Sequence, residues 1–177
     1  MPRRGIAVQI DKFDVADLGN ALRLDGVGVV QLPTDTNLTN TTKVTGLWGE
    51  IEVPARGMKA AQQATYNIPQ IYGPLVSRIM TGKCYTFTIR GSMTVVDKDT
   101  KENVDVPVRY DITGPFSQKN PGKIEQAGTG DGDMIQQVWA FAWWIDGDEV
   151  RAWDVIKGID RVGGIDQNAD ILRNIMM

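Results

Sequence analysis

Apolar and polar residues alternate along the middle of the chain, between residues 83 and 113. Apolar side chains share one parity in each of two runs: Tyr85, Phe87, Ile89, Met93 and Val95, then Val104, Val106, Val108, Tyr110 and Ile112. Such alternation is typical of strands that bury one face and wet the other. A polar turn over residues 97–102 joins the runs, so the pattern predicts a long antiparallel hairpin. Pro107 cannot donate a ladder hydrogen bond, which predicts an edge, a bulge or exposure at that point of the second strand.

A second hairpin is predicted closer to the C-terminus. Its first strand has six residues of one parity: Ile135, Gln137, Trp139, Phe141, Trp143 and Ile145. Asp146-Gly147 follows, a dipeptide that favours two-residue hairpin turns, and a return strand is expected from about Glu149 to Val155. Trp144 breaks the parity of its neighbours, so at least one tryptophan is expected on the opposite face.

The remaining segments carry weaker patterns. Strands are expected over 27–32 and 44–53, with a polar loop over 34–42 between them. A short helix is expected from Pro74 to Met80, because proline suits a first helical turn and Gly82 suits a helix end. The prediction is one domain over 1–177: mainly β, with two packed antiparallel sheets, one short flanking α-helix and extended terminal arms. The arms are assigned to 1–26 and 159–177, and a long inter-subunit loop to 114–132.

Composition narrows the classes of function. The 177 residues are 42% apolar and 23% charged with a net charge of −3, which fits a globular domain and lacks the basic excess usual in nucleic-acid binders. There is no histidine, which excludes Ser-His-Asp and Cys-His catalysis and histidine-based zinc sites. Cys84 is the single cysteine, so no intrachain disulfide forms. We expect no catalytic residue, no metal and no cofactor.

The sequence predicts neither a secretion signal nor a membrane-spanning helix. The first residues are basic, and the segment after them lacks the apolar run of a secretion signal, so synthesis in the cytoplasm is expected. No stretch of about 18 apolar residues predicts a membrane-spanning helix.

Several residue groups suggest chemistry, but each has a plainer interpretation. Residues 128–133 (GTGDGD) lack the lysine and the following helix of a phosphate loop, so a flexible loop is favoured. Asp97, Asp99 and Asn103 fit a hairpin turn better than a calcium loop. Two alternatives stay open. One is a monomeric β-sandwich that binds carbohydrate or protein through its tryptophans, and the other is a hydrolase that uses carboxylates such as Glu50, Glu52, Asp105 and Asp111.

The C-terminal stretch resembles one known family. The residues that carry the resemblance are Asp146-Gly147-Asp148-Glu149, Trp153-Asp154-Val155-Ile156, the run 159–166 (IDRVGGID) and Leu172-Arg173-Asn174-Ile175. They are similar to the end of the major tail-tube proteins of contractile-tailed bacteriophages, which R-type bacteriocins share. The start, Met1-Pro2-Arg3-Arg4, and the order of hairpin, loop and hairpin over 83–157 are similar too.

The resemblance implies a structural protein of the virion tail or bacteriocin particle. Its copies would form hexameric rings that stack into a tube inside a contractile sheath, and DNA and a tape measure protein would pass through the lumen. The sheath protein and a baseplate initiator are further implied partners, with no membrane binding by the subunit. Carried onto this chain, the lumen or inter-subunit residues would be Thr86, Thr88, Arg90, Ser92, Asp105, Arg109 and Asp111. Ring-to-ring or sheath contacts would involve Lys119, Lys123, Glu125, Asp166, Arg173 and Asn174. Which face of the hairpin lines the lumen stays open at this point.

Overall fold

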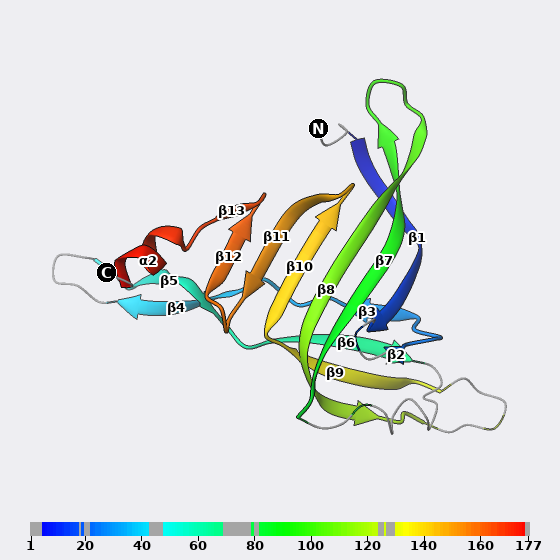
Figure 1. Cartoon of the computed structure of the whole chain (residues 1–177), viewed down its shortest axis with the longest axis horizontal. Coiled ribbons are helices and arrows are strands. Elements are labelled where there is room, and N and C mark those ends of the chain that lie inside the picture. Colours follow the sequence, from blue (N-terminus) through cyan, green and yellow to red (C-terminus); the bar gives the residue numbers. More distant parts are fainter. Residues whose placement is uncertain are drawn as a thin grey trace.

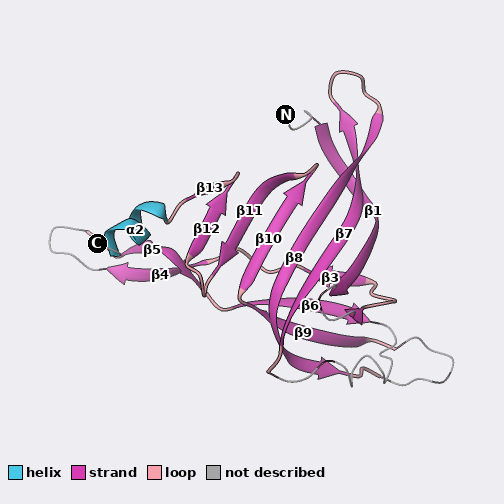
Figure 2. Cartoon of the chain, viewed as in Figure 1, coloured by secondary structure: helices cyan, strands magenta, loops and turns pink. Residues whose placement is uncertain are grey.

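The computed structural model describes residues 5–17, 19, 22–42, 48–68, 79, 82–123, 126 and 130–175. The strands are β1 (Gly5–Asp17), β2 (Leu22–Arg23), β3 (Val29–Gln31), β4 (Asn37–Thr42), β5 (Ile51–Lys59), β6 (Gln62–Ile68), β7 (Cys84–Asp97), β8 (Asn103–Asn120), β9 (Gly132–Val138), β10 (Ala140–Ile145), β11 (Asp148–Asp154), β12 (Ile159–Val162) and β13 (Ile165–Asp166) (Figures 1 and 2). Within the described part the helix is α2 (Ala169–Ile175), which confirms a mainly β fold with one short helix. The helix predicted from Pro74 to Met80 lies outside the described residues except for Ile79.

The large sheet is antiparallel and has the order β13-β12-β11-β10-β8-β7-β1-β2 (Figure 1). Its centre is the predicted first hairpin, since β7 and β8 pair without a break from Cys84 and Pro115 to Val96 and Asn103. Pro107 is exposed and lies one residue beyond the β8–β10 ladder, whose last pair is Val108 with Ile145. Its missing N–H therefore costs no hydrogen bond between β8 and β10, as the sequence indicated.

A second group of strands shares β8 with the large sheet. Beyond Gly114, β8 leaves β10 and pairs with β9 from Phe116 onward, and β9 continues through β6 to β3. In Figure 1 these strands cross beneath the lower ends of β7 and β8. The long strand β8 thus turns the corner between two layers, and each layer buries the apolar face of the other.

The core lies between these two layers. The side chains of β6 alternate between buried and partly or fully exposed along its length, so every second residue points into the core. Tyr66 of β6 packs against Phe87 and Phe116, with ring centroids 5.8 Å and 5.9 Å apart. Phe87 and Phe116 meet edge to face at 5.6 Å. Aromatic contacts of this kind add stability beyond the area they bury.

The second predicted hairpin is present, but its first strand is divided. β9 and β10 are separated at Trp139, and the buried parity changes there. In β9 the even positions Met134, Gln136 and Val138 are buried, whereas Phe141 is the buried residue of β10. The prediction that all six odd-numbered residues share one face is therefore wrong, because the chain passes from one layer to the other between them. The predicted turn at Asp146-Gly147 is confirmed, because the two residues have φ of 53° and 83°, as a type I′ turn requires.

The predicted arms and loops are also partly strand. Residues 5–17 of the expected N-terminal arm form β1, which pairs with β7 along most of its length. The expected loop 114–132 is shorter, because β8 continues to Asn120 and β9 begins at Gly132. The expected C-terminal arm contains β12, β13 and α2, and the expected loop 34–42 contains β4. In the strands of these segments, pairing with a neighbouring strand satisfies the backbone hydrogen bonds. The composition of a segment does not show whether such a neighbour is present.

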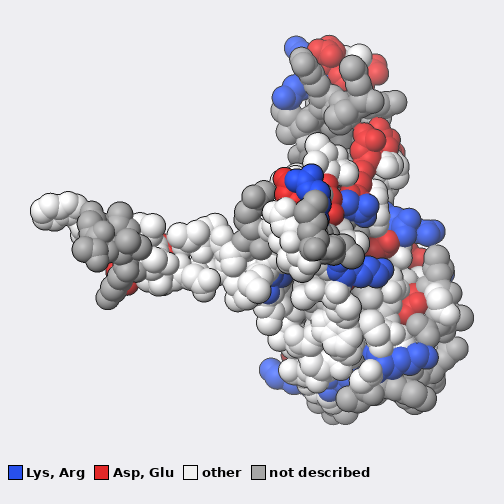
Figure 3. Space-filling model, turned by 60° about the vertical axis from the view of Figure 1, so that its left-hand side comes forward, with Lys and Arg blue, Asp and Glu red and all other residues white. Residues whose placement is uncertain are grey.

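β4 and β5 form a two-stranded ribbon that leaves the rest of the molecule (Figures 1 and 3). They pair from Thr42 with Ile51 back to Asn37 with Lys59, with a bulge near the base. Figure 3 shows the ribbon as a narrow projection with few charged side chains. We call β4 and β5 together the ribbon.

Candidate assembly surfaces

The residues predicted to line a channel or an interface lie on one face of the large sheet. They are Thr86, Thr88, Arg90 and Ser92 of β7 and Asp105, Arg109 and Asp111 of β8. The β7–β8 register places Thr88 beside Asp111, Arg90 beside Arg109, and Thr94 beside Asp105. Paired residues of an antiparallel ladder project to the same side, so the sequence placed the seven correctly on one face. We call it the polar face, although Thr88 is buried within it.

Arg109 is the most connected residue of the polar face. Its Nε and Nη2 atoms donate to Asp111 Oδ1 and Oδ2 at 3.0 Å and 2.6 Å. Its guanidinium also lies over the ring of Trp144, 4.8 Å from the centroid. A bidentate ion pair and a cation–π contact fix an otherwise flexible side chain and neutralise its charge. Arg109 and Asp111 therefore leave little net charge at this point of the face.

Strand β1 extends the polar face with acidic residues. Asp14 lies beside Arg90 in the β1–β7 register and pairs with Arg23 at 3.2 Å. Asp11 accepts hydrogen bonds from the Thr94 hydroxyl and the Gln9 amide, both at 2.6 Å. These bonds, first the one from Thr94 and then the one from Gln9, hold the pKa of Asp11 below its ordinary value. Acidic and basic groups consequently alternate across the face.

Among the described residues, nothing pairs with the outer edge of β1 along most of its length. Within the part of the chain that the structure describes, its outward backbone bonds are confined to one end. Ala16 and Asp17 pair with β2, and the Val15 carbonyl accepts from Leu24 N–H at 2.9 Å. An exposed strand edge is a template for pairing with a strand of another chain. Bulges between Ala7 and Gln9 and between Ile10 and Lys12 make this edge irregular.

A cluster of four ionic residues fixes the base of the ribbon, and sequence patterns gave no sign of it. Lys59 Nζ lies 2.6 Å from Asp35 Oδ1 and 3.7 Å from Asp160 Oδ2, and it donates to Asn37 Oδ1 at 2.8 Å. Arg151 Nε donates to the other Asp35 oxygen at 2.6 Å, and its Nη1 also contacts Asp160. Lys59 has a side chain only 3% exposed. We call Asp35, Lys59, Arg151 and Asp160 the ionic cluster. Asp35 precedes β4 and Lys59 ends β5, so the ionic cluster joins the two chain segments at the base of the ribbon to β11 and β12.

The charges of the ionic cluster shift the titration of Asp35. Burial alone would raise the pKa of Asp35, but the hydrogen bonds from Arg151 and Lys59 outweigh it and lower the pKa below 3.8. A carboxyl whose pKa is lower in the folded state stabilises that state once the pH exceeds the unfolded pKa, which is about 3.9. The contribution is lost as the pH falls through the folded pKa.

We therefore expect acid to loosen the base of the ribbon. Between pH 7 and pH 5 the urea midpoint should change little through Asp35, and below about pH 5 it should fall. The Asp35→Asn variant has no carboxyl to titrate, so the gap between its midpoint and that of the parent chain should narrow as the pH drops to 3. Two midpoint curves that stay parallel from pH 7 to pH 3 would contradict this role for Asp35.

The turn before α2 packs against the ribbon as well. Asn168 is buried and donates from Nδ2 to the Gly158 carbonyl at 3.1 Å. Gly57 of β5 has a φ of 73°, and a Cβ atom there would lie 2.7 Å from the Asn168 amide. Only glycine adopts this positive φ freely and also leaves the Asn168 side chain in place. The ribbon and the C-terminal turn therefore pack closely at Gly57.

The residues predicted to contact other rings or the sheath fall on two separate surfaces. Lys119 and Lys123 lie at the end of β8, where Lys119 Nζ contacts the Ile79 carbonyl and Lys123 N–H donates to Asp131 at 2.7 Å. Asp166 of β13 accepts from Asn168 N–H at 2.9 Å, and Arg173 and Asn174 belong to α2, which lies beside the ribbon (Figure 1). Arg173 pairs with Asp170 at 2.9 Å, and Asn174 is exposed. Glu125 lies outside the described residues.

The tryptophans do not form one platform for a sugar. Trp153 is buried in the core, and Trp143 stacks on Tyr110 with centroids 5.8 Å apart. Trp144 lies on the polar face over Arg109, which confirms that one tryptophan points away from its neighbours. Trp139 is 41% exposed where β9 meets β10.

The carboxylates considered for hydrolysis are also dispersed. Glu50 and Glu52 belong to the ribbon and its tip, whereas Asp105 and Asp111 lie on the polar face. Among the described residues no group of three or more His, Cys, Asp or Glu side chains is placed to hold a metal ion. None of the helices in the described ranges is long and apolar enough to cross a membrane.

Comparison with known proteins adds one match. A family model described as phage tail tube protein FII matches residues 19–176, which is nearly the whole chain. Among curated proteins, none is similar enough to this chain to count as a match.

Proposed function

This chain belongs to the phage tail tube protein FII family, and we propose that its copies form hexameric rings that stack into the inner tube of a contractile tail. The family gives the chain a structural role in the tail tube. The ring number, the surrounding sheath and the passage of DNA are the proposal. One observation supports it most: a polar sheet face borders an open strand edge.

Ring closure is supported by the open edge of β1. Among the described residues, the outer side of this strand is bonded only at its end, to β2 and Leu24, so we take its outer backbone groups from Gly5 to Asp14 as available to a strand of a second copy. The opposite edge of the large sheet ends in the short strands β12 and β13. Joining unlike edges of identical subunits is a head-to-tail contact, which closes into a ring when the rotation is right. The large sheets would then form one continuous wall.

The polar face suits the inside of such a wall. Its arginines and carboxylates are mixed, and Arg109 is neutralised by Asp111. A surface without a basic excess does not bind phosphates tightly, so DNA or a tape measure protein would pass without sticking. We assign Thr86, Thr88, Arg90, Ser92, Asp105, Arg109 and Asp111 to the lumen side. The mechanism is passive and needs no catalytic residue or cofactor.

The two surfaces outside the polar face, at the end of β8 and beside the ribbon, would contact other rings and the sheath. Lys119 and Lys123, at the end of β8, and Asp166, Arg173 and Asn174, beside the ribbon, are proposed to contact neighbouring rings or the sheath protein. A baseplate initiator would nucleate the first ring. The same tube would serve an infectious phage or a headless bacteriocin, in the virion tail or the bacteriocin particle.

Electron microscopy of the purified protein tests the proposal. Negatively stained samples at increasing concentration should show rings or hollow tubes of uniform width, and light scattering should show a mass that grows with concentration. A compact monomer at every concentration up to the limit of solubility would contradict the proposal. Saturable binding of a carbohydrate by that monomer would favour a binding module instead.

A further inference from the structure

A bulge separates the outer part of the ribbon from its base. At the base, Asn37 pairs with Lys59. The next pair is Thr39 with Pro54, so β5 places four residues, 55–58, opposite a single residue of β4. A bulged strand bends at such a point. Within the described strands, β4 and β5 pair only with each other. Strand pairing therefore does not decide in which direction the ribbon leaves the molecule.

The ionic cluster fits the base of the ribbon in one arrangement only. The ribbon side supplies an acid and a base, Asp35 and Lys59, and the large sheet supplies Arg151 and Asp160. Asp35 contacts both cations at 2.6 Å, and Asp160 contacts both as well. Positive and negative groups thus alternate around a closed ring. Any other placement of the base would bring like charges together beside the buried Lys59 side chain, which is unfavourable.

The bulge itself is held by Asn168, which lies between β13 and α2. Asn168 is 5% exposed, and its side-chain amide fills the space beside Gly57 of the bulge. Its N–H donates to Asp166 Oδ1 at 2.9 Å and its Nδ2 donates to the Gly158 carbonyl at 3.1 Å. These bonds fix the amide in one position, so the bulge cannot bend toward it.

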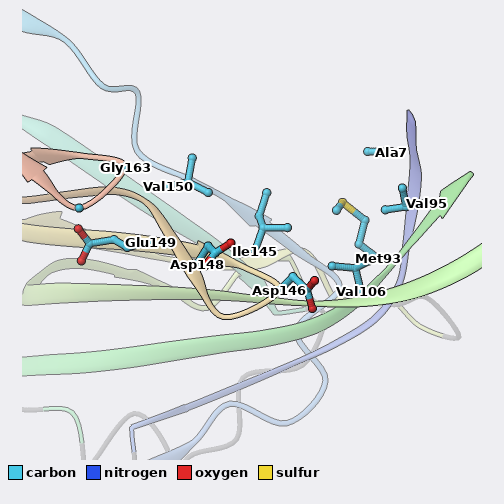
Figure 4. A pocket seen from close by; sticks show the side chains of 11 residues that line it. Ala7, Met93, Val95, Val106, Ile145, Asp146, Asp148, Glu149, Val150 and Gly163 are labelled. Atoms are coloured by element: carbon cyan, nitrogen blue, oxygen red, sulfur yellow. The ribbon is translucent and has the colours of Figure 1, made fainter. Parts of the chain in front are cut away.

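Both contacts come from one C-terminal segment, residues 159–168. Gln167 N–H donates to the Asp160 carbonyl at 2.7 Å, which ties the turn that carries Asn168 to the ionic cluster. Gly163 N–H donates to the Val150 carbonyl at 3.0 Å, and Figure 4 shows Gly163 beside Val150 at this edge of the sheet. The segment is therefore part of the large sheet, and it holds the ribbon from there.

We propose that residues 159–168 hold the ribbon in one direction in the free chain, through Asp160 at its base and Asn168 at its bulge, and that assembly requires this direction. The part about assembly rests on the proposed function, whereas the direction of the ribbon does not. Symmetric copies make identical contacts, so a projecting element must leave every copy at the same angle. A ribbon fixed beforehand loses less conformational freedom when copies join. The buried charges thus specify geometry more than they add stability.

Spin labels measure the direction of the ribbon. In a Cys84→Ser background, because Cys84 is exposed, labels are placed at Thr41→Cys on the outer ribbon and at Thr86→Cys on β7. Double electron–electron resonance then gives the distribution of distances between the labels in chains too dilute to assemble. One narrow distance is expected for the parent chain. The label pair Thr86→Cys and Asp148→Cys lies on the large sheet alone and shows whether a variant disturbs the sheet.

An apolar replacement of the whole ionic cluster separates direction from stability. Replacing all members of a buried ion network is often neutral, whereas removing one partner is destabilising. The combined variant is Asp35→Leu, Lys59→Met, Arg151→Met and Asp160→Leu. Its urea midpoint should therefore lie above that of Lys59→Met alone. Its ribbon distances should spread over a clearly wider range, and assembly should need at least about tenfold more protein, because the ribbon must be ordered when copies join.

Gly57→Ala acts on the other contact and leaves the ionic cluster unchanged. The added Cβ atom would lie 2.7 Å from the Asn168 amide, so the ribbon distance should shift or broaden. The matched control is Lys157→Met, whose exposed ion pair with Asp154 lies on the same side of the molecule but outside both contacts. That variant should keep the ribbon distance and the assembly of the parent chain.

The outcomes separate this inference from the proposed function. Altered ribbon distances in the combined variant and in Gly57→Ala, with unchanged sheet distances and weaker assembly, support it. If the combined variant does not fold, Gly57→Ala decides. A narrow, unshifted ribbon distance in every folded variant overturns the inference, and so does assembly at the parent concentration by a chain whose ribbon distances are broad. A parent chain that never associates contradicts the tube function, while the ribbon distances still test the direction.

Discussion

Replacing Gly114 with alanine is expected to destabilise the fold by at least about 3 kcal/mol. A Cβ atom at this position would lie 1.8 Å from the Gln137 carbonyl oxygen, and that oxygen belongs to the backbone. No rotamer change relieves the clash, so β8 and the β9–β10 crossing must separate. The separation would strain the bonds from Gln136 Nε2 to the Gly114 carbonyl, 2.8 Å, and from Trp139 N–H to the Thr113 carbonyl, 2.8 Å.

Thermal unfolding measures this effect. For a domain of this size, about 3 kcal/mol corresponds to a fall of roughly 6–12 °C in Tm. Gly28→Ala is the matched control, because no atom lies within 4 Å of a Cβ there and its φ is not positive. That variant should be neutral or slightly more stable, since alanine restricts the unfolded chain. A Gly114→Ala chain with the parent Tm would contradict the tight crossing between the layers.

Replacing Lys59 with methionine is expected to cost about 3–5 kcal/mol, the range for removing one partner of a buried ion pair. The Lys59 side chain is 3% exposed and its partner Asp160 is 10% exposed. Methionine keeps the apolar stem but leaves two carboxylates with Arg151 as their remaining cation in the ionic cluster. An uncompensated buried charge is costly because water cannot reach it.

Urea unfolding and amide hydrogen exchange together test the Lys59 prediction. The midpoint should fall, and exchange should accelerate first in β4 and β5, because the ionic cluster holds the base of the ribbon. Lys157→Met is the control: its partner Asp154 is 3.7 Å away and the lysine side chain is 72% exposed. Exposed pairs contribute little, so this variant should stay within about 0.5 kcal/mol of the parent. Equal effects at Lys59 and Lys157 would contradict a special role for the ionic cluster.

Where the chain is locally regular, the sequence predicted the structure well. The alternation over 83–113 specifies a two-faced strand pair whatever lies around it, and the Asp146-Gly147 turn needs only two residues that accept positive φ. The face shared by Arg90, Arg109 and Asp111 followed from parity alone. The C-terminal motif identified the tail-tube family, which the matching family model confirms over residues 19–176.

The sequence predicted less well where a segment depends on distant partners. β4 has the composition of a polar loop and becomes a strand because β5 pairs with it. β1 lacks a clear period, yet β7 pairs with it almost to its end. A strand needs hydrogen bonds from another strand, so its presence is decided by what lies beside it and not by its own residues.

What the sequence determined by itself is therefore the set of local elements and their faces: the β7–β8 hairpin, the type I′ turn and the polar side of the sheet. Only the tertiary structure decided where strands change layers, at Gly114 and Trp139, since a close backbone approach between distant segments leaves no mark in local periodicity. Only the tertiary structure brought Asp35, Lys59, Arg151 and Asp160 into contact, because they are spread over the chain and ion pairs form between neighbours in space. Periodicity reports which way a side chain points, whereas the fold decides what it meets.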